Sequence, residues 1–137
     1  IRNFILELGK GFSFIGNQHR LEYNSKEYFV DMLFFHRGLR SLVAVELKIG
    51  SFKAEYIGKM NLYLSLLDKL EKGENENQSI GIILCADKDH LDVEIALQDI
   101  NKPIGVAEYQ LLLPKDELQA LLVEEIKASE EINEKQK

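Results

Sequence analysis

Val43-Ala44-Val45-Glu46-Leu47-Lys48-Ile49 decides the fold of this chain, because the stretch places a carboxylate and an ammonium group inside an otherwise apolar run. Its apolar residues recur with a period of two, which is the period of a β-strand. The odd-numbered side chains are expected on one face of the strand. The other face then carries Ala44, Glu46 and Lys48.

A second charged residue, Asp31, interrupts the apolar run Tyr28-Phe29-Val30-Asp31-Met32-Leu33-Phe34-Phe35. Burying an unpaired carboxylate costs several kcal/mol or more, so such a group becomes neutral, pairs with a cation or binds a metal ion. If the two strands are neighbours, Asp31, Glu46 and Lys48 converge on one point. Carboxylate oxygens beside an ammonium group suit a hard divalent cation such as Mg²⁺, for which Mn²⁺ is a substitute.

Length and composition indicate one soluble domain. The 137 residues are enough to close a hydrophobic core. The apolar runs are too short to cross a bilayer, and the first residues lack the pattern of a signal peptide. The single cysteine, Cys85, excludes an intrachain disulfide and fits a reducing compartment. We therefore expect a cytoplasmic protein without a membrane partner.

The charges are unevenly distributed along the chain. The net charge of -6 argues against nonspecific coating of nucleic acid. Between residues 36 and 59, however, cationic residues outnumber acidic ones, and the excess of acids lies after residue 115. A phosphate-bearing partner is compatible with the basic stretch. Its candidate contacts are Arg37, Arg40, Lys53 and Lys59.

The order of elements predicts a mixed α/β sheet with helices on its faces. A helix over residues 1–9 precedes three strands joined by short turns, which form an antiparallel meander. A long helix, a buried strand, a second helix, a short strand and a final helix from Pro114 follow. We expect Asp87 or Asp89 to cap the second of these helices. Its predicted apolar face consists of Leu91, Val93, Ile95, Ala96 and Ile100.

The predicted strands cover residues 11–23, 27–35, 41–49, 80–85 and 104–109. We expect one domain over residues 1–128 and a charged helical tail over residues 129–137. The chain lacks an initiator methionine and opens in apolar, helix-like sequence, so we also expect it to be a C-terminal fragment of a longer protein.

An acid in the second strand, Glu-x-Lys in the third and a helix after them resemble the PD-(D/E)xK nuclease superfamily. Its restriction-endonuclease-like fold is shared by Holliday-junction resolvases and RecB-type nucleases. Asp31 corresponds to the first acid of the motif, and Glu46-Leu47-Lys48 to (D/E)-x-K. Val30 stands where the motif has proline. The resemblance implies an αβββαβ core, here with an extra C-terminal helix.

Within that superfamily, the chain is similar to the nuclease domain of the YhcG family of bacterial proteins. The resemblance is carried by residues 29–37, by Val45-Glu46-Leu47-Lys48-Ile49-Gly50 and by residues 99–106, and it extends to about Leu113. Members of this family carry a separate N-terminal helical domain, which the resemblance implies as a partner. Cutting both DNA strands commonly needs two sites, so we also expect a homodimer.

The resemblance implies a metal-dependent endonuclease that acts on DNA, including branched, recombination, repair or defence-related DNA. Asp31 and Glu46 would each give the Mg²⁺ ion one oxygen, with the Leu47 carbonyl as a further ligand. Lys48 would orient the attacking water and offset charge in the transition state.

Two further residues are candidates for the same site. Glu7, from the first helix, would add a carboxylate ligand or support the water network, and Gln18 would bridge to the substrate or to a water. Related nucleases often place Gln-x-x-x-Tyr on the helix after Glu-x-Lys, where this chain has Lys59 and Tyr63. A lysine contacts phosphate, but it lacks the paired donor and acceptor of an amide.

Other interpretations of these residues stay open. Glu46 and Lys48 could form an ion pair of little energy on a solvated strand face, Glu7 could be a solvated helix residue, and Tyr63 could pack in the core. The domain would then be a catalytically inactive nuclease-fold module for DNA binding or protein assembly. Such a module binds DNA without metal, with an affinity that falls steeply with salt.

Overall fold

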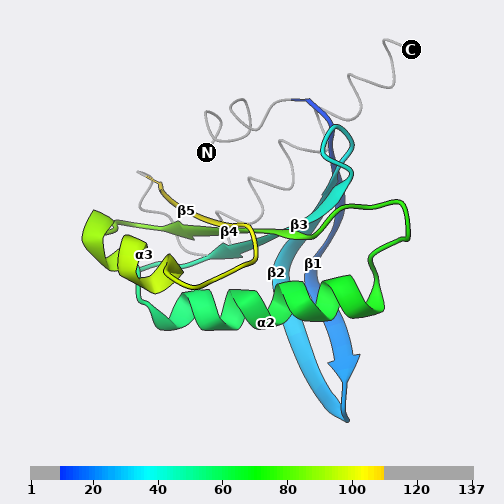
Figure 1. The fold of residues 1–137 in the computed structure, drawn as a ribbon, viewed down its shortest axis with the longest axis horizontal. Helices are drawn as coiled ribbons and strands as arrows, with labels where there is room; N and C mark the ends of the chain where they lie inside the picture. The colour runs from blue at the N-terminus through cyan, green and yellow to red at the C-terminus, as the bar shows by residue number, and fades with distance from the viewer. Residues whose placement is uncertain (1–9, 110–137) are drawn as a thin grey trace.

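The computed structural model describes residues 10–109, which form a five-stranded sheet with two helices (Figure 1). The predicted helices over residues 1–9 and after Pro114, the tail over 129–137 and the candidate Glu7 lie outside the described residues. The described elements in chain order are β1 (Phe12–Tyr23), β2 (Lys26–His36), β3 (Ser41–Leu47), α2 (Glu55–Leu70), β4 (Ile80–Cys85), α3 (His90–Leu97) and β5 (Ile104–Glu108).

β1 and β2 form a long antiparallel hairpin closed by Asn24 and Ser25. These two residues have φ angles of 54° and 61°. Two consecutive left-handed residues are what a tight type I′ turn requires, and its twist matches that of the strands it joins. The predicted hairpin is therefore confirmed, with β1 one residue shorter at its start than expected and β2 one residue longer at each end.

The sheet is mixed, as predicted. Its strand order is β1-β2-β3-β4-β5, with β2 antiparallel to β3. β4 is parallel to both β3 and β5, so each of these two connections needs a crossover. α2 and α3 provide the two crossovers, and Figure 1 shows them on the same side of the sheet.

Strand alternation divides the core into two clusters, one on each face of the sheet. The cluster beside α2 includes Leu33, Ala44 and Ile83, which pack with Met60 and Leu64 of the helix. The other cluster contains Met32, Phe34, Val43, Val45, Leu47 and Leu84. The predicted period of two in β3 is therefore confirmed, and it leaves Glu46 on the face that α2 covers.

The predicted third strand is shortened by two residues. β3 ends at Leu47 rather than at Ile49. The amide of Lys48 still donates to the carbonyl of Leu84 at 2.8 Å, so the main chain stays beside β4 for one more residue. Lys48 therefore lies at the point where the strand leaves the sheet.

The predicted apolar face of the helix after β4 is confirmed for Val93, Ala96 and Ile100, which pack with the core, and wrong for Leu91 and Ile95. Asp89 caps α3 by accepting hydrogen bonds from the amides of Leu91 and Asp92. Leu91 and Ile95, however, are 68% and 69% exposed. Residues four apart share one face of a helix, and here that face points to solvent while Val93 is buried. So many apolar residues in an eight-residue helix cannot all lie on one side.

No helix in the described part of the chain has both the length and the apolar character to cross a membrane.

Candidate active site

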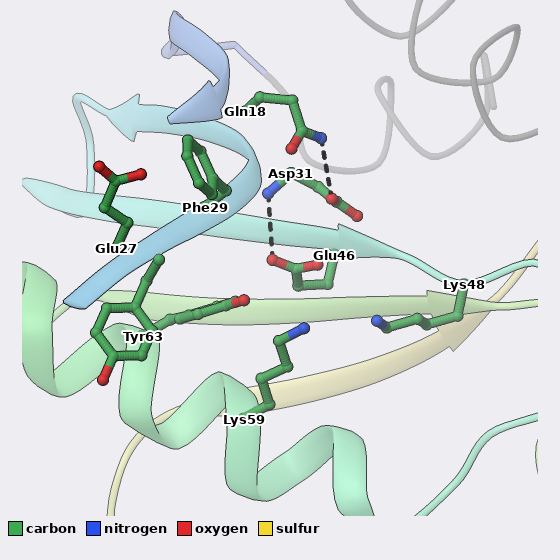
Figure 2. A pocket seen from close by; sticks show the side chains of 9 residues that line it. Gln18, Glu27, Phe29, Asp31, Glu46, Lys48, Lys59 and Tyr63 are labelled. Carbon is green, nitrogen blue, oxygen red and sulfur yellow. Dashed lines mark hydrogen bonds between the residues drawn. The ribbon is translucent and has the colours of Figure 1, made fainter. Parts of the chain in front are cut away.

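β2 and β3 bring Asp31 and Glu46 side by side. Met32 pairs with Val45 in this antiparallel ladder. Asp31, one residue before Met32, therefore lies opposite Glu46, one residue after Val45. Both carboxyl groups are buried, at 6% and 5% residue exposure. The Asp31 amide donates to Glu46 Oε1 at 3.2 Å, a contact drawn in Figure 2, and the Leu47 amide donates to Asp31 Oδ2 at 3.0 Å.

β1 adds Gln18 to the pair. The register places Asn17 opposite Met32 and His19 opposite Val30, so Gln18 lies opposite Asp31. Its Nε2 donates to Asp31 Oδ1 at 3.2 Å (Figure 2). Gln18 has a φ of 49°, a left-handed conformation that is unusual inside a strand and costs on the order of 1 kcal/mol or more. The strained residue thus contacts the buried acid directly.

Two lysines face the acids from other elements. Lys48 follows the last residue of β3, and Lys59 belongs to α2. Figure 2 shows both ammonium groups directed into the same space beside Glu46. Lys48 Nζ lies 4.7 Å from the ring centroid of Tyr56, and Lys59 Nζ lies 5.7 Å from that of Tyr63. Tyr56 and Tyr63 both belong to α2. Each ammonium group therefore lies near an aromatic ring of this helix, an arrangement that stabilises the cation and holds it in place.

These groups line one cavity of about 380 Å³. Its polar side chains come from four elements or their ends, which the fold assembles from distant parts of the sequence. The lining residues are Gln18, Glu27, Tyr28, Phe29, Asp31, Glu46, Lys48, Lys59 and Tyr63.

Burial and the neighbouring charge perturb the titration of these groups. Burial, followed by the charge of Asp31, raises the pKa of Glu46 to about 8. The pKa of Lys59 is also raised, first by its hydrogen bond to the Tyr63 hydroxyl and further by the charges of Glu46 and Asp31. The two acids therefore favour a positive charge close to them, because such a charge offsets both the burial of Glu46 and its repulsion by Asp31.

This donor set fits a hard divalent cation. Among the described residues, no group of three or more histidine, cysteine or acidic side chains gathers at one point, so a site enclosed by protein ligands alone is not formed there. Mg²⁺ typically binds through one or two carboxylates and retains several waters. Asp31 and Glu46 provide such a pair, and burial followed by the charge of Asp31 raises the pKa of Glu46, so a cation placed between the two carboxylates would favour their ionised forms. The main chain of Leu47 lies beside it.

The four basic residues predicted to contact phosphate do not all line the cavity. Lys59 lines the cavity, whereas Arg37, Arg40 and Lys53 do not. Arg37 and Arg40 belong to the turn that joins β2 to β3, and each is six residues from the acid on its own strand. At about 3.4 Å per residue this is roughly 20 Å. An antiparallel hairpin places its turn at the opposite end from the site, so Arg37 and Arg40 lie apart from the cavity, and their contacts with phosphate stay predictions.

Sequence reasoning missed one end of the cavity and one of its walls. Glu27 and Phe29 precede Asp31 at intervals of two residues on β2, and this alternation was the signal that could have identified them. Tyr63 is 3% exposed and belongs to the core, as expected, but it also lines the cavity. The resemblance to Gln-x-x-x-Tyr was the signal for that second position.

Comparison with known proteins places this geometry in a family context. The sequence model of the family described as the YhcG PDDEXK nuclease domain matches residues 1–127. The YhcG protein of Escherichia coli (strain K12) is 39% identical over 116 residues, which are 85% of this chain and 31% of that protein. The chain thus spans about a third of the length of this curated relative.

Two solved structures share the fold. A repair endonuclease from Pyrococcus abyssi aligns with a TM-score of 0.56 at 18% identity, covering 82% of this chain and 46% of that chain. A complex of EndoMS with dsDNA aligns with a TM-score of 0.52 at 15% identity, covering 78% of this chain and 44% of that chain. The mixed sheet with its helices is thus the restriction-endonuclease-like fold predicted from the motif.

Proposed function

We propose that this chain, which belongs to the family of YhcG PDDEXK nuclease domains, is an endonuclease domain that hydrolyses phosphodiester bonds of DNA with a divalent cation. The observation that carries the proposal is the buried pair of Asp31 and Glu46, which share one cavity with two lysines. The structural neighbour in complex with dsDNA supports DNA as the substrate.

Asp31 and Glu46 would hold Mg²⁺ or Mn²⁺, with the Leu47 carbonyl as a further ligand. When bound, the cation supplies positive charge beside the phosphate and lowers the pKa of a water molecule. Gln18 keeps the Asp31 carboxylate in one orientation through the hydrogen bond from its Nε2. In this proposal Glu7, which lies outside the described residues, adds a further carboxylate.

The two lysines would act on the phosphate. Lys48 orients the attacking water and offsets the negative charge that develops at the phosphorus, an electrostatic effect that needs a cation held in a fixed position. Lys59 contacts a phosphate oxygen from α2, and the ring of Tyr63 fixes the position of the Lys59 ammonium group. The carboxylates and the cations thus approach the scissile group from different sides.

The wider setting is also part of the proposal. We propose a cytoplasmic protein in which this domain works beside an N-terminal helical domain and pairs with a second copy when it cuts both strands. Analytical ultracentrifugation with and without a DNA duplex measures the pairing.

Cleavage of DNA tests the proposed activity. Linear, nicked and branched duplexes are incubated with Mg²⁺ or Mn²⁺ and with EDTA, using the wild type, Glu46→Ala, Lys48→Ala, Lys59→Met and Lys69→Met. We expect cleavage that requires the metal, and a loss of about 10²- to 10³-fold for each of the first two substitutions. Lys59→Met should raise KM more than it lowers kcat.

Lys69→Met is the matched control. Lys69 also belongs to α2 and also rests on an aromatic ring, with its Nζ 5.6 Å from the centroid of Tyr23, but it does not line the cavity. Its substitution should leave cleavage unchanged. Absence of cleavage by the folded wild type on every duplex, with DNA binding that persists in EDTA, would instead establish a binding module.

A further inference from the structure

The cavity has two chemically different ends. One end carries the acids and lysines already described. The other is formed by consecutive residues of β2, Glu27, Tyr28 and Phe29. Figure 2 shows Glu27, Phe29 and Asp31 in a row along this strand. The second end adjoins the charged end, because Phe29 and Asp31 are two residues apart, or roughly 7 Å along the strand.

Phe29 leaves an aromatic ring available at this second end. The residue is 43% exposed, and within residues 10–109 it belongs to neither core cluster and to none of the aromatic pairs. Tyr28, beside it, packs against the core cluster under α2 and forms a fixed part of the wall. A flat apolar group that covers Phe29 would remove its ring from water and gain the stacking energy of two π-systems.

Glu27 determines which flat group fits. Its side chain is 54% exposed and accepts a hydrogen bond from Arg20 Nη2 at 2.9 Å. Because Arg20 offsets part of its charge, Glu27 selects chiefly by hydrogen bonding: a carboxylate accepts from the amino groups of bases and has no donor to offer a phosphate. The second end therefore suits a nucleobase, and the first end suits a phosphate.

We propose that this cavity accepts a single unpaired nucleotide of the DNA, with its base against Phe29 and its phosphate at Asp31 and Glu46. The inference rests on the proposed nuclease function and specifies its substrate class. A base inside a duplex is stacked and paired, so it reaches an aromatic ring in a cavity only after leaving the stack. A base that is already unpaired, in a bulge, a gap or at a branch, avoids that cost. The volume of about 380 Å³ is in the range of small-ligand sites.

Paired and bulged duplexes test the proposal. Two duplexes of identical sequence differ in one unpaired 2-aminopurine next to a defined phosphate. Their affinities are measured by anisotropy in Ca²⁺, and their cleavage is measured in Mg²⁺. We expect the wild type to bind and cut the bulged duplex about tenfold better, in line with the stacking of a base on an aromatic side chain.

Three variants separate stacking from general effects on the fold. Phe29→Ala should remove the preference for the bulged duplex, because it lowers binding and cleavage of the bulged duplex about tenfold more than those of the paired duplex. Phe29→Leu, which keeps apolar bulk without an aromatic ring, should lose most of the preference too. Tyr23→Ala removes a ring of 42% exposure from the same hairpin but outside the cavity, and it should leave the preference intact.

The outcomes distinguish the two levels of the proposal. If the wild type cuts both duplexes equally, or if Phe29→Ala lowers affinity for both by the same factor, the unpaired-nucleotide inference is wrong and the nuclease proposal stands. If the wild type neither binds nor cuts any duplex in Mg²⁺, the nuclease proposal fails, and this inference fails with it.

Discussion

At the residue scale, the carboxyl group of Glu46 opposes folding when it is charged. Burial and the charge of Asp31 raise its pKa from 4.5 to about 8, so the folded protein favours its protonated form. A group with a raised pKa contributes stability that is complete below pH 4.5 and is lost as the pH rises through 8. A divalent cation that binds the ionised acid would restore stability in the same pH range.

Glu46→Gln tests this conflict. The amide has the same shape, and its oxygen still accepts from the Asp31 amide, but it carries no charge. In EDTA we expect the variant to be more stable than the wild type at pH 8.5 by about 1–3 kcal/mol, and to lose this advantage at pH 4.5. Urea unfolding at the two pH values measures the difference.

Added Mg²⁺ should then stabilise the wild type at pH 8.5 and leave Glu46→Gln unchanged. Equal stability of the two proteins at both pH values would show that the buried acid is not strained by its environment.

At the element scale, the contact of α2 with β4 determines how closely the helix that lines the cavity approaches the sheet. Gly81 of β4 lies under α2, where a Cβ would stand 2.6 Å from Cγ and 2.7 Å from Sδ of Met60. Met60 is 1% exposed, so its side chain lies among other core residues. The helix that carries Lys59 and Tyr63 therefore approaches the sheet closely because this position has no side chain.

Gly81→Ala should destabilise the protein by about 1–3 kcal/mol, the usual cost of overpacking a filled core. Gly58→Ala is the matched control, because Gly58 lies in α2 with nothing within 4 Å of its added Cβ. That substitution should raise stability by up to about 1 kcal/mol, since alanine favours a helix. Urea unfolding of both variants measures the effects. A neutral Gly81→Ala would mean that α2 is free to move away from the sheet.

β1 shows a second way in which an element shapes the site. Its pairing with β2 shifts register between Phe14 and Gly16, and Gln18 then adopts its left-handed φ. Such irregularities redirect side chains at functional sites. The amide of Gln18 reaches Asp31 as a consequence of this local distortion.

At the scale of the whole molecule, local patterns predicted the elements and the motif, while contacts between distant elements determined the rest. The apolar run 80–85, the turn at Asn24 and Ser25, and the alternation around Glu46 each contain their own signal, and the structure confirms them. Because the strand order follows from short connections, the sequence also predicted the approach of Asp31 to Glu46.

What the sequence could not predict depends on how elements pack. The periodicity of α3 does not say which of its apolar residues meet the sheet, and Leu91 and Ile95 are exposed. Alternation along β2 places Phe29 near Asp31, but the position of α2 beside the long hairpin, which completes the cavity, depends on packing that no local pattern encodes. The same topology removes Arg37 from the site.

Paramagnetic broadening by Mn²⁺ in an NMR spectrum tests the central claim most directly, because it locates a bound metal ion without relying on activity. In a titration of the protein with substoichiometric Mn²⁺, we expect the amide signals of residues 30–32 and 45–48 to be lost first. The same titration of Glu46→Gln should leave them visible. Broadening confined to the acidic residues 129–137, or equal broadening in both proteins, would contradict a metal site at Asp31 and Glu46.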